Sequence, residues 1–85
     1  MSFSSCIASH PWLSSRIGFN LELDALVFMW KAHATLVMSV QRGDTGLIEV
    51  RCDETWQNME EGEVRVVATY ADLLLLLEEL APSEP

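Results

Sequence analysis

The middle of the chain alternates between apolar and polar side chains, which is the pattern of a β-strand with one buried face. Two such runs, 34–41 and 47–52, are joined by the short loop 42–46, whose glycines and aspartate are typical of a β-hairpin. A third run follows at 63–70. The inward positions predicted for the first two runs are Leu36, Met38, Val40, Ile48, Val50 and Cys52.

The N-terminal half contains one clear strand pattern and one ambiguous stretch. Apolar side chains at every second position of 17–23 predict a half-buried strand, with Ile17, Phe19, Leu21 and Leu23 on one face. The next stretch, 25–32, fits a second strand with Leu26, Phe28 and Trp30 on one face, and a helix over 21–32 capped at Asn20 fits it too. Its β-branched and aromatic content favours the strand, and the helix stays open as the alternative.

A run of leucines near the C-terminus predicts a helix that ends before Pro82. Thr69 and Asp72 have the spacing of a capping box, and an aspartate is favourable at the positive end of a helix. Five consecutive leucines at about 100° per residue cover the whole circumference of the helix. We assign Leu73, Leu76, Leu77 and Leu80 to the side that meets the sheet, so Leu74 and Leu75 are expected to face outward.

Together these elements predict an α+β fold, in which a small antiparallel sheet, a three- or four-stranded meander, is packed by a C-terminal helix. The 85 residues are expected to form a single domain, 1–85. Residues 1–15 are expected to be a loose N-terminal arm, with one helical turn starting at Pro11 and with Trp12 and Leu13 against the core. Residues 81–85 are expected to be a frayed tail.

Charge narrows the classes of partner. Five basic and thirteen acidic residues give a net charge of −8, which disfavours binding to nucleic acid or to an anionic membrane surface. The same charge is compatible with a basic protein partner and equally with solubility alone. The N-terminus lacks the features of a signal peptide, and no apolar run approaches the roughly 20 residues that span a bilayer.

No motif for catalysis, metal binding or a cofactor is present. Cys6 and Cys52 form no Cys-x-x-Cys pair, which predicts a reduced, cytoplasmic protein, and Cys52 is expected to be an inert buried thiol. Neither His10 nor His33 has other ligands at the spacings of a metal site. We therefore expect no catalytic residue, no metal and no cofactor, and the chain is not expected to be an enzyme.

An acidic stretch surrounds Trp56 and Met59 and includes carboxylates at 53, 54, 60, 61 and 63. It lacks the pattern of a calcium loop. It is either a solvated loop or a recognition loop, in which Trp56 is a buried anchor while Glu60 and Glu61 steer a basic partner. The candidate protein-binding residues are Leu74, Leu75, Trp56, Glu60 and Glu61.

The sequence thus predicts a non-catalytic acidic protein-binding module that acts through an apolar helix face and the acidic Trp-containing loop, as a homodimer or in a hetero-complex. In size, charge and element order the chain resembles bacterial secretion chaperones, phage-encoded inhibitors and toxin-immunity proteins. That resemblance implies an inhibitor, immunity or chaperone-like adaptor of bacterial or phage origin. The alternative is a small ligand-binding or enzymatic domain with a pocket between sheet and helix, which a buried polar group there would favour.

Overall fold

The computed structural model describes residues 2–55 and 59–82. Its sheet has five antiparallel strands that pair in chain order, so the expected α+β meander is confirmed and the expected number of strands, three or four, is wrong. Both N-terminal strands join the sheet. In chain order the elements are α1 (Phe3–Ala8), α2 (Pro11–Ser14), β1 (Ile17–Glu22), β2 (Ala25–Trp30), β3 (His33–Arg42), β4 (Ile48–Cys52), β5 (Val64–Val67) and α3 (Tyr70–Leu80).

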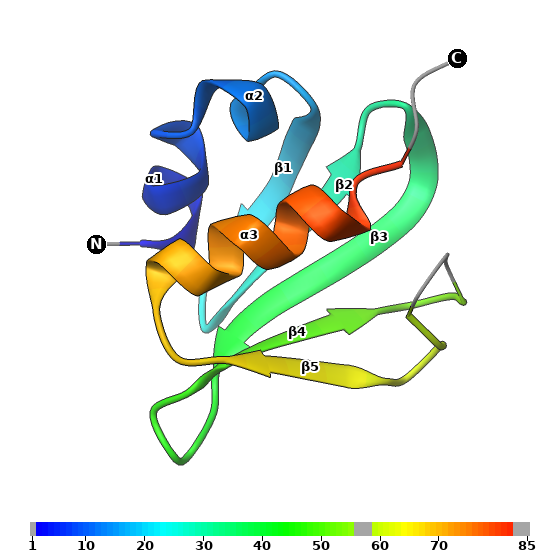
Figure 1. Ribbon diagram of the computed structural model, residues 1–85. Coiled ribbons are helices and arrows are strands. Elements are labelled where there is room, and N and C mark those ends of the chain that lie inside the picture. Colours follow the sequence, from blue (N-terminus) through cyan, green and yellow to red (C-terminus); the bar gives the residue numbers. More distant parts are fainter. Residues whose placement is uncertain (1, 56–58, 83–85) are drawn as a thin grey trace.

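The three helices pack on one face of the sheet, which we call the inner face (Figure 1). The core between the two layers is apolar, and no polar or charged residue of the described chain is buried. The opposite face of the sheet, the open face, is covered by no helix or strand within 2–55 and 59–82. The strand registers assign to the open face Gly18, Leu21, Ala25, Val27, Met29, Val37, Ser39, Gln41, Glu49, Arg51, Val64 and Val66.

The strands β2, β3 and β4 follow the predicted alternation. Residues 25–30 form a strand, which decides between the two alternatives for this stretch. The inward side chains are buried as expected at Leu26, Phe28, Trp30, Met38, Val40, Ile48, Val50 and Cys52. Leu36, also predicted to share this face, belongs to 34–36, whose backbone alone the structure describes.

The hairpin between β3 and β4 is also confirmed. The amide of Gly43 donates to the carbonyl of Leu47 at 2.8 Å, which closes the loop. Gly46 adopts a φ of 84°, a left-handed conformation that glycine reaches without the clash of a Cβ atom. Gly46, one of the glycines singled out in the sequence, therefore provides the geometry of the turn.

Strand β1 departs from its predicted pattern. Its register with β2 shifts between Phe19 and Leu21, which marks a β-bulge with Asn20 as the extra residue. Beyond the bulge Leu21 pairs with Val27 on the open face, so the prediction of one continuous apolar face is wrong. Ile17 is buried, whereas Leu21 is 56% exposed. A period-two pattern contains no sign of an inserted residue, and for this reason the shift was missed.

The expectation of a loose arm over 1–15 is wrong for its described part, 2–15, because α1 and α2 are helical and packed on the core. Phe3, Cys6 and Ile7 are buried, and their spacing places them on one side of a helix. The Glu22 carboxylate of β1 accepts hydrogen bonds from the Phe3 amide at 3.0 Å and the Ser4 hydroxyl at 2.6 Å. These bonds lower the pKa of Glu22, the Ser4 hydroxyl contributing most.

The helical turn expected at Pro11 is present as α2, with His10 as its N-cap. Leu13 is fully buried, as expected, but Trp12 is half exposed and lies under the Arg16 guanidinium, 4.1 Å from the ring centroid. The Nδ1 atom of His10 accepts from the Leu13 amide at 3.2 Å, so Nε2 is left to donate to Glu78 of α3 at 3.0 Å. This contact links the start of α2 to the C-terminal part of α3.

Helix α3 begins and packs as predicted. The hydroxyl of Thr69 accepts a hydrogen bond from the Asp72 amide at 3.1 Å, which confirms the cap. Leu73, Leu76, Leu77 and Leu80 are the buried leucines of the helix, which confirms the predicted packing side. Of the expected frayed tail, Pro82 is buried, and 83–85 lie outside the described residues.

Candidate functional site

The apolar surface that α3 exposes to solvent is small. Leu75 is 60% exposed, whereas Leu74 is half-buried against the core, so the expectation that both face outward is wrong for Leu74. The helix neighbours of Leu75 three and four positions away are exposed and mostly acidic: Ala71, Asp72, Glu78 and Glu79. A single leucine among carboxylates is ordinary for a protein surface.

The acidic loop between β4 and β5 is only partly described. Glu60 and Glu61 are exposed, as a recognition loop requires, and the proposed anchor Trp56 lies outside the described residues. Met59 is buried and belongs to the core, so it fastens this loop to the body of the protein. A single methionine within an acidic stretch gives no sign of that role in the sequence.

The open face of the sheet carries uncovered apolar side chains. Leu21 and Val66 are both more than half exposed, and Val27, Met29 and Val37 are half-buried between them on the open face. The registers place Leu21, Val27, Ser39, Arg51 and Val64 in one row that crosses all five strands. Leu21, Val27, Met29 and Val37 form an apolar group on β1 to β3, and Glu49 and Arg51 of β4 separate this group from Val64 and Val66. An uncovered apolar group of this kind commonly marks an interaction site.

The sequence contained a signal for this surface. Strand β2 reads ALVFMW and is apolar at every position, which is typical of a strand covered on both faces rather than one. Among the described residues, the helices cover only its inner face. The second apolar face of β2 is therefore the feature that indicates the candidate site.

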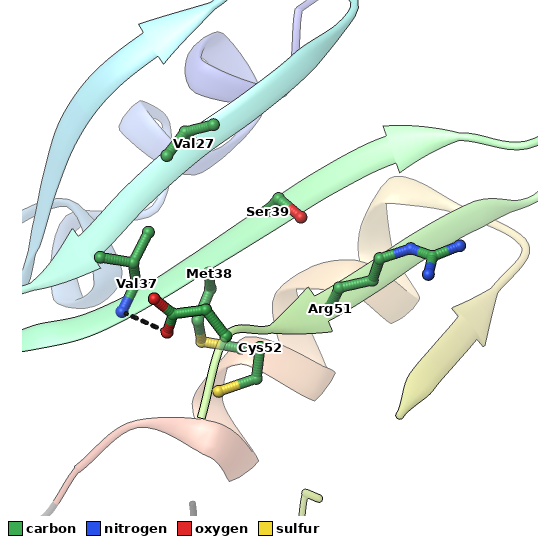
Figure 2. Close-up of a pocket in the computed structure, with 7 residues that line it drawn as sticks. Val27, Val37, Met38, Ser39, Arg51 and Cys52 are labelled. Carbon is green, nitrogen blue, oxygen red and sulfur yellow. Dashed lines mark hydrogen bonds between the residues drawn. The ribbon is translucent and has the colours of Figure 1, made fainter. Parts of the chain in front are cut away.

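A shallow hollow of about 220 Å³, the central hollow, lies in the middle of the open face. Its lining comes from β2, β3 and β4 and from the residue that follows β4 (Figure 2). The side chains of Met38 and Cys52 are buried on the inner face, while the other lining residues belong to the open side. The lining consists of Val27, Val37, Met38, Ser39, Arg51, Cys52 and Asp53.

Asp53 and Arg51 give the central hollow two ends of opposite charge. The amide of Asp53 donates to the Val37 carbonyl at 3.1 Å, and its Oδ1 accepts from the Val37 amide at 3.3 Å. The guanidinium of Arg51 extends away from Val37 (Figure 2), and its Nη2 lies 3.5 Å from Oε1 of Glu49. The same carboxylate oxygen accepts from the side-chain Nε2 of Gln41 at 3.3 Å.

The alternative interpretation needed a pocket between sheet and helix, and that space is filled by the apolar core. The central hollow lies on the opposite face. Ligand pockets usually measure about 300–1,000 Å³, so the hollow is small for a metabolite and suits a single side chain of a larger partner.

Candidate chemistry is sparse in the described part of the chain. No group of three or more His, Cys, Asp or Glu side chains there is arranged to hold a metal ion. Burial raises the pKa of the Cys52 thiol, whose sulfur donates to the Glu54 carbonyl at 2.8 Å. A thiol with a raised pKa is mostly protonated at neutral pH and is a poor nucleophile.

No family model, curated protein or solved structure matches the chain. Within 2–55 and 59–82, the helices are too short to cross a bilayer.

Proposed function

We propose that the chain is a non-catalytic protein-binding module whose open face, with the adjoining acidic loop, binds a partner protein that presents basic residues beside apolar ones. One observation carries this proposal: the apolar face of the sheet that no described element covers meets the acidic loop at Asp53. A sheet normally buries each apolar face against another layer. The partner supplies that layer.

The size of the face supports this role. The protein measures 37 × 27 × 21 Å along its principal axes, so its broad side accommodates the roughly 800 Å² that each partner contributes to a standard interface. Full burial of a leucine or valine side chain contributes about 1.5–3 kcal/mol. Leu21 and Val66 are more than half exposed in the free protein, so burial of each on binding contributes a large part of that free energy.

Charge supports a basic partner over a second copy. The described loop presents Asp53, Glu54, Glu60 and Glu61 to solvent, and carboxylates around an interface accelerate the encounter with a cationic surface. Two copies of a chain with a net charge of −8 repel each other. A hetero-complex is therefore the proposed assembly, and a homodimer is a competing outcome of the test.

The proposal also includes the cellular compartment of the protein and the kind of binding protein that it is. Cys6 and Cys52 are both buried and free, which supports a reducing compartment such as the cytoplasm. A small acidic module of this kind fits an inhibitor, an immunity protein or a chaperone-like adaptor, all of which act by covering a surface of another protein.

Site-specific photocrosslinking in the source cells tests the proposal. A photoreactive residue at Leu21 or Val66 samples the open face, and one at Leu75 samples the helix layer as a matched control. We expect the open-face positions to give one discrete crosslinked protein with a basic surface, and Leu75 to give none. Charge reversal by Glu60→Lys with Glu61→Lys should slow association with that protein and reduce its salt dependence.

Light scattering of the purified protein provides the second arm. A monomer mass is expected. A doubled mass that Val66→Lys abolishes would instead assign the open face to a second copy of the chain. Crosslinks that arise from Leu75 alone would move the binding surface to α3 and contradict the proposal.

A further inference from the structure

The size of the central hollow and the opposite charges at its two ends indicate which kind of side chain it binds. Resting on the proposed function, we infer that the central hollow receives one lysine or arginine side chain of the partner. Its aliphatic stem lies on Val27 and Val37, and its cationic head meets the carboxylate of Asp53.

The floor of the hollow suits the stem. Val27 and Val37 are half-buried on the adjacent strands β2 and β3, where Val27 pairs with Ser39 and Val37 pairs with Met29. Lysine and arginine bury their methylene groups along apolar surface while the charged head stays in contact with water. A hollow of about 220 Å³ that is open to solvent permits this arrangement.

Asp53 is fixed in the position that the head requires. The hydrogen bond from the Val37 amide to Oδ1 holds its side chain beside the hollow. An ionised carboxylate has about four acceptor positions, so one such bond leaves capacity for a cationic donor. Glu54 is the next residue and is exposed, which adds negative potential on the same side.

Arg51 sets the direction of the incoming side chain. Its guanidinium extends toward Glu49, away from Val37 and hence from the end that Asp53 occupies (Figure 2). A cation placed near Arg51 is repelled, whereas one at Asp53 is attracted. An acidic side chain of the partner is repelled by Asp53 at one end of the hollow and by Glu49, which lies beside Arg51, at the other.

Amide chemical shifts of the ¹⁵N-labelled protein measure this preference directly. The probes are N-acetyl-lysine N′-methylamide and its norleucine and glutamate counterparts, which share a backbone and differ in the side chain. We expect the lysine probe to shift the amides of Val27, Val37, Ser39 and Asp53 at a concentration about two- to fivefold lower than norleucine, as for an exposed ion pair. The glutamate probe should leave these amides unchanged.

Two variants isolate the role of the charge. Asp53→Asn keeps an oxygen that accepts from the Val37 amide and removes the negative charge. Asp44→Asn makes the same chemical change in the hairpin loop beyond the other end of β3 and serves as the matched control. The advantage of lysine over norleucine should disappear in the first variant and persist in the second.

Equal shifts from lysine and norleucine in the unmodified protein would overturn the inference, as would a lysine advantage that survives Asp53→Asn. Shifts centred on Glu60 and Glu61 instead of the hollow would overturn it too. Each of these results, obtained while crosslinks still arise from Leu21 and Val66, rejects the cation pocket alone. Crosslinks confined to Leu75 reject the proposed function whatever the probes do.

Discussion

The indole Nε1 of Trp30 donates a hydrogen bond to the sulfur of Met38, 3.0 Å away in the interior of the protein. Both side chains are buried, and they come from the neighbouring strands β2 and β3. A thioether is a weak acceptor, but a buried indole N–H without any partner is unfavourable. Met38 therefore satisfies the polar atom that Trp30 brings into an otherwise apolar core.

Replacing this sulfur should destabilise the fold beyond the effect of the volume change. Met38→Leu is expected to lower the free energy of unfolding by about 2 kcal/mol, because the indole N–H is left unsatisfied in addition to the repacking. Met59→Leu, at another buried methionine, should cost less than about 1.5 kcal/mol. Urea unfolding of the two variants provides the comparison, and equal losses would show that the sulfur has no special role.

The leucines of α3 should differ sharply in their contributions. Leu77→Ala removes a fully buried side chain and should cost about 2–5 kcal/mol through lost contacts and a residual cavity. Leu75→Ala, the same change on the exposed side of the helix, should stay within about 0.5 kcal/mol of the parent. Thermal unfolding distinguishes them, and a comparable loss at both positions would mean that Leu75 is covered in the isolated protein.

Glu22 should make stability depend on pH through its bonds to α1. Its pKa is lowered in the folded protein from an ordinary value of 4.5, so its contribution is present above that value and is lost as the pH falls through the folded pKa. Glu22→Gln should cost about 0.5–1 kcal/mol at pH 7, and the difference from the parent should shrink below pH 4.5.

The exposed Glu61 provides the control for Glu22, because Glu61→Gln removes one equal charge in the loop between β4 and β5. Denaturant unfolding at a series of pH values should show a pH-dependent gap for Glu22→Gln and none for Glu61→Gln. A gap of constant size across the acidic range would mean that the carboxylate of Glu22 acts by packing alone.

The two thiols should be protected from reagents by the fold. Burial raises the pKa values of Cys6 and Cys52, so both should react slowly with a disulfide reagent at pH 7 and quickly once denaturant is added. Cys52→Ala should cost about 1 kcal/mol through lost packing. A Cys6–Cys52 disulfide in the mass spectrum of freshly prepared, non-reduced protein would contradict the proposed reducing compartment.

Local patterns predicted the elements whose environment is uniform along their length. The inward positions of β2 and β4 follow from alternation, because each strand has one face on the core throughout. The packing side of α3 follows from the angular spacing of Leu73, Leu76, Leu77 and Leu80, and its start follows from Thr69.

The remaining features depend on partners distant in sequence. Nothing between Ile17 and Leu23 indicates the bulge at Asn20, since it exists only relative to the register of β2. The N-terminal helix α1 is too short to be stable alone and is held by its burial and by Glu22, nineteen positions after Phe3. The central hollow likewise exists only because the register brings Val37 beside Asp53.

The order of the strands has a consequence for how the chain folds during synthesis. Every strand pairs with its neighbour in sequence, so each hairpin of the sheet can form as soon as its two strands have left the ribosome. The inner face, however, is covered by helices from both ends of the chain. Leu77 and Leu80 of α3 are among the last of its core residues to be translated. Until then a nascent sheet exposes apolar side chains on both faces, which makes this the stage most prone to aggregation. Slow translation of α3 should accordingly reduce the yield of folded protein, although the order of the strands would be unaffected.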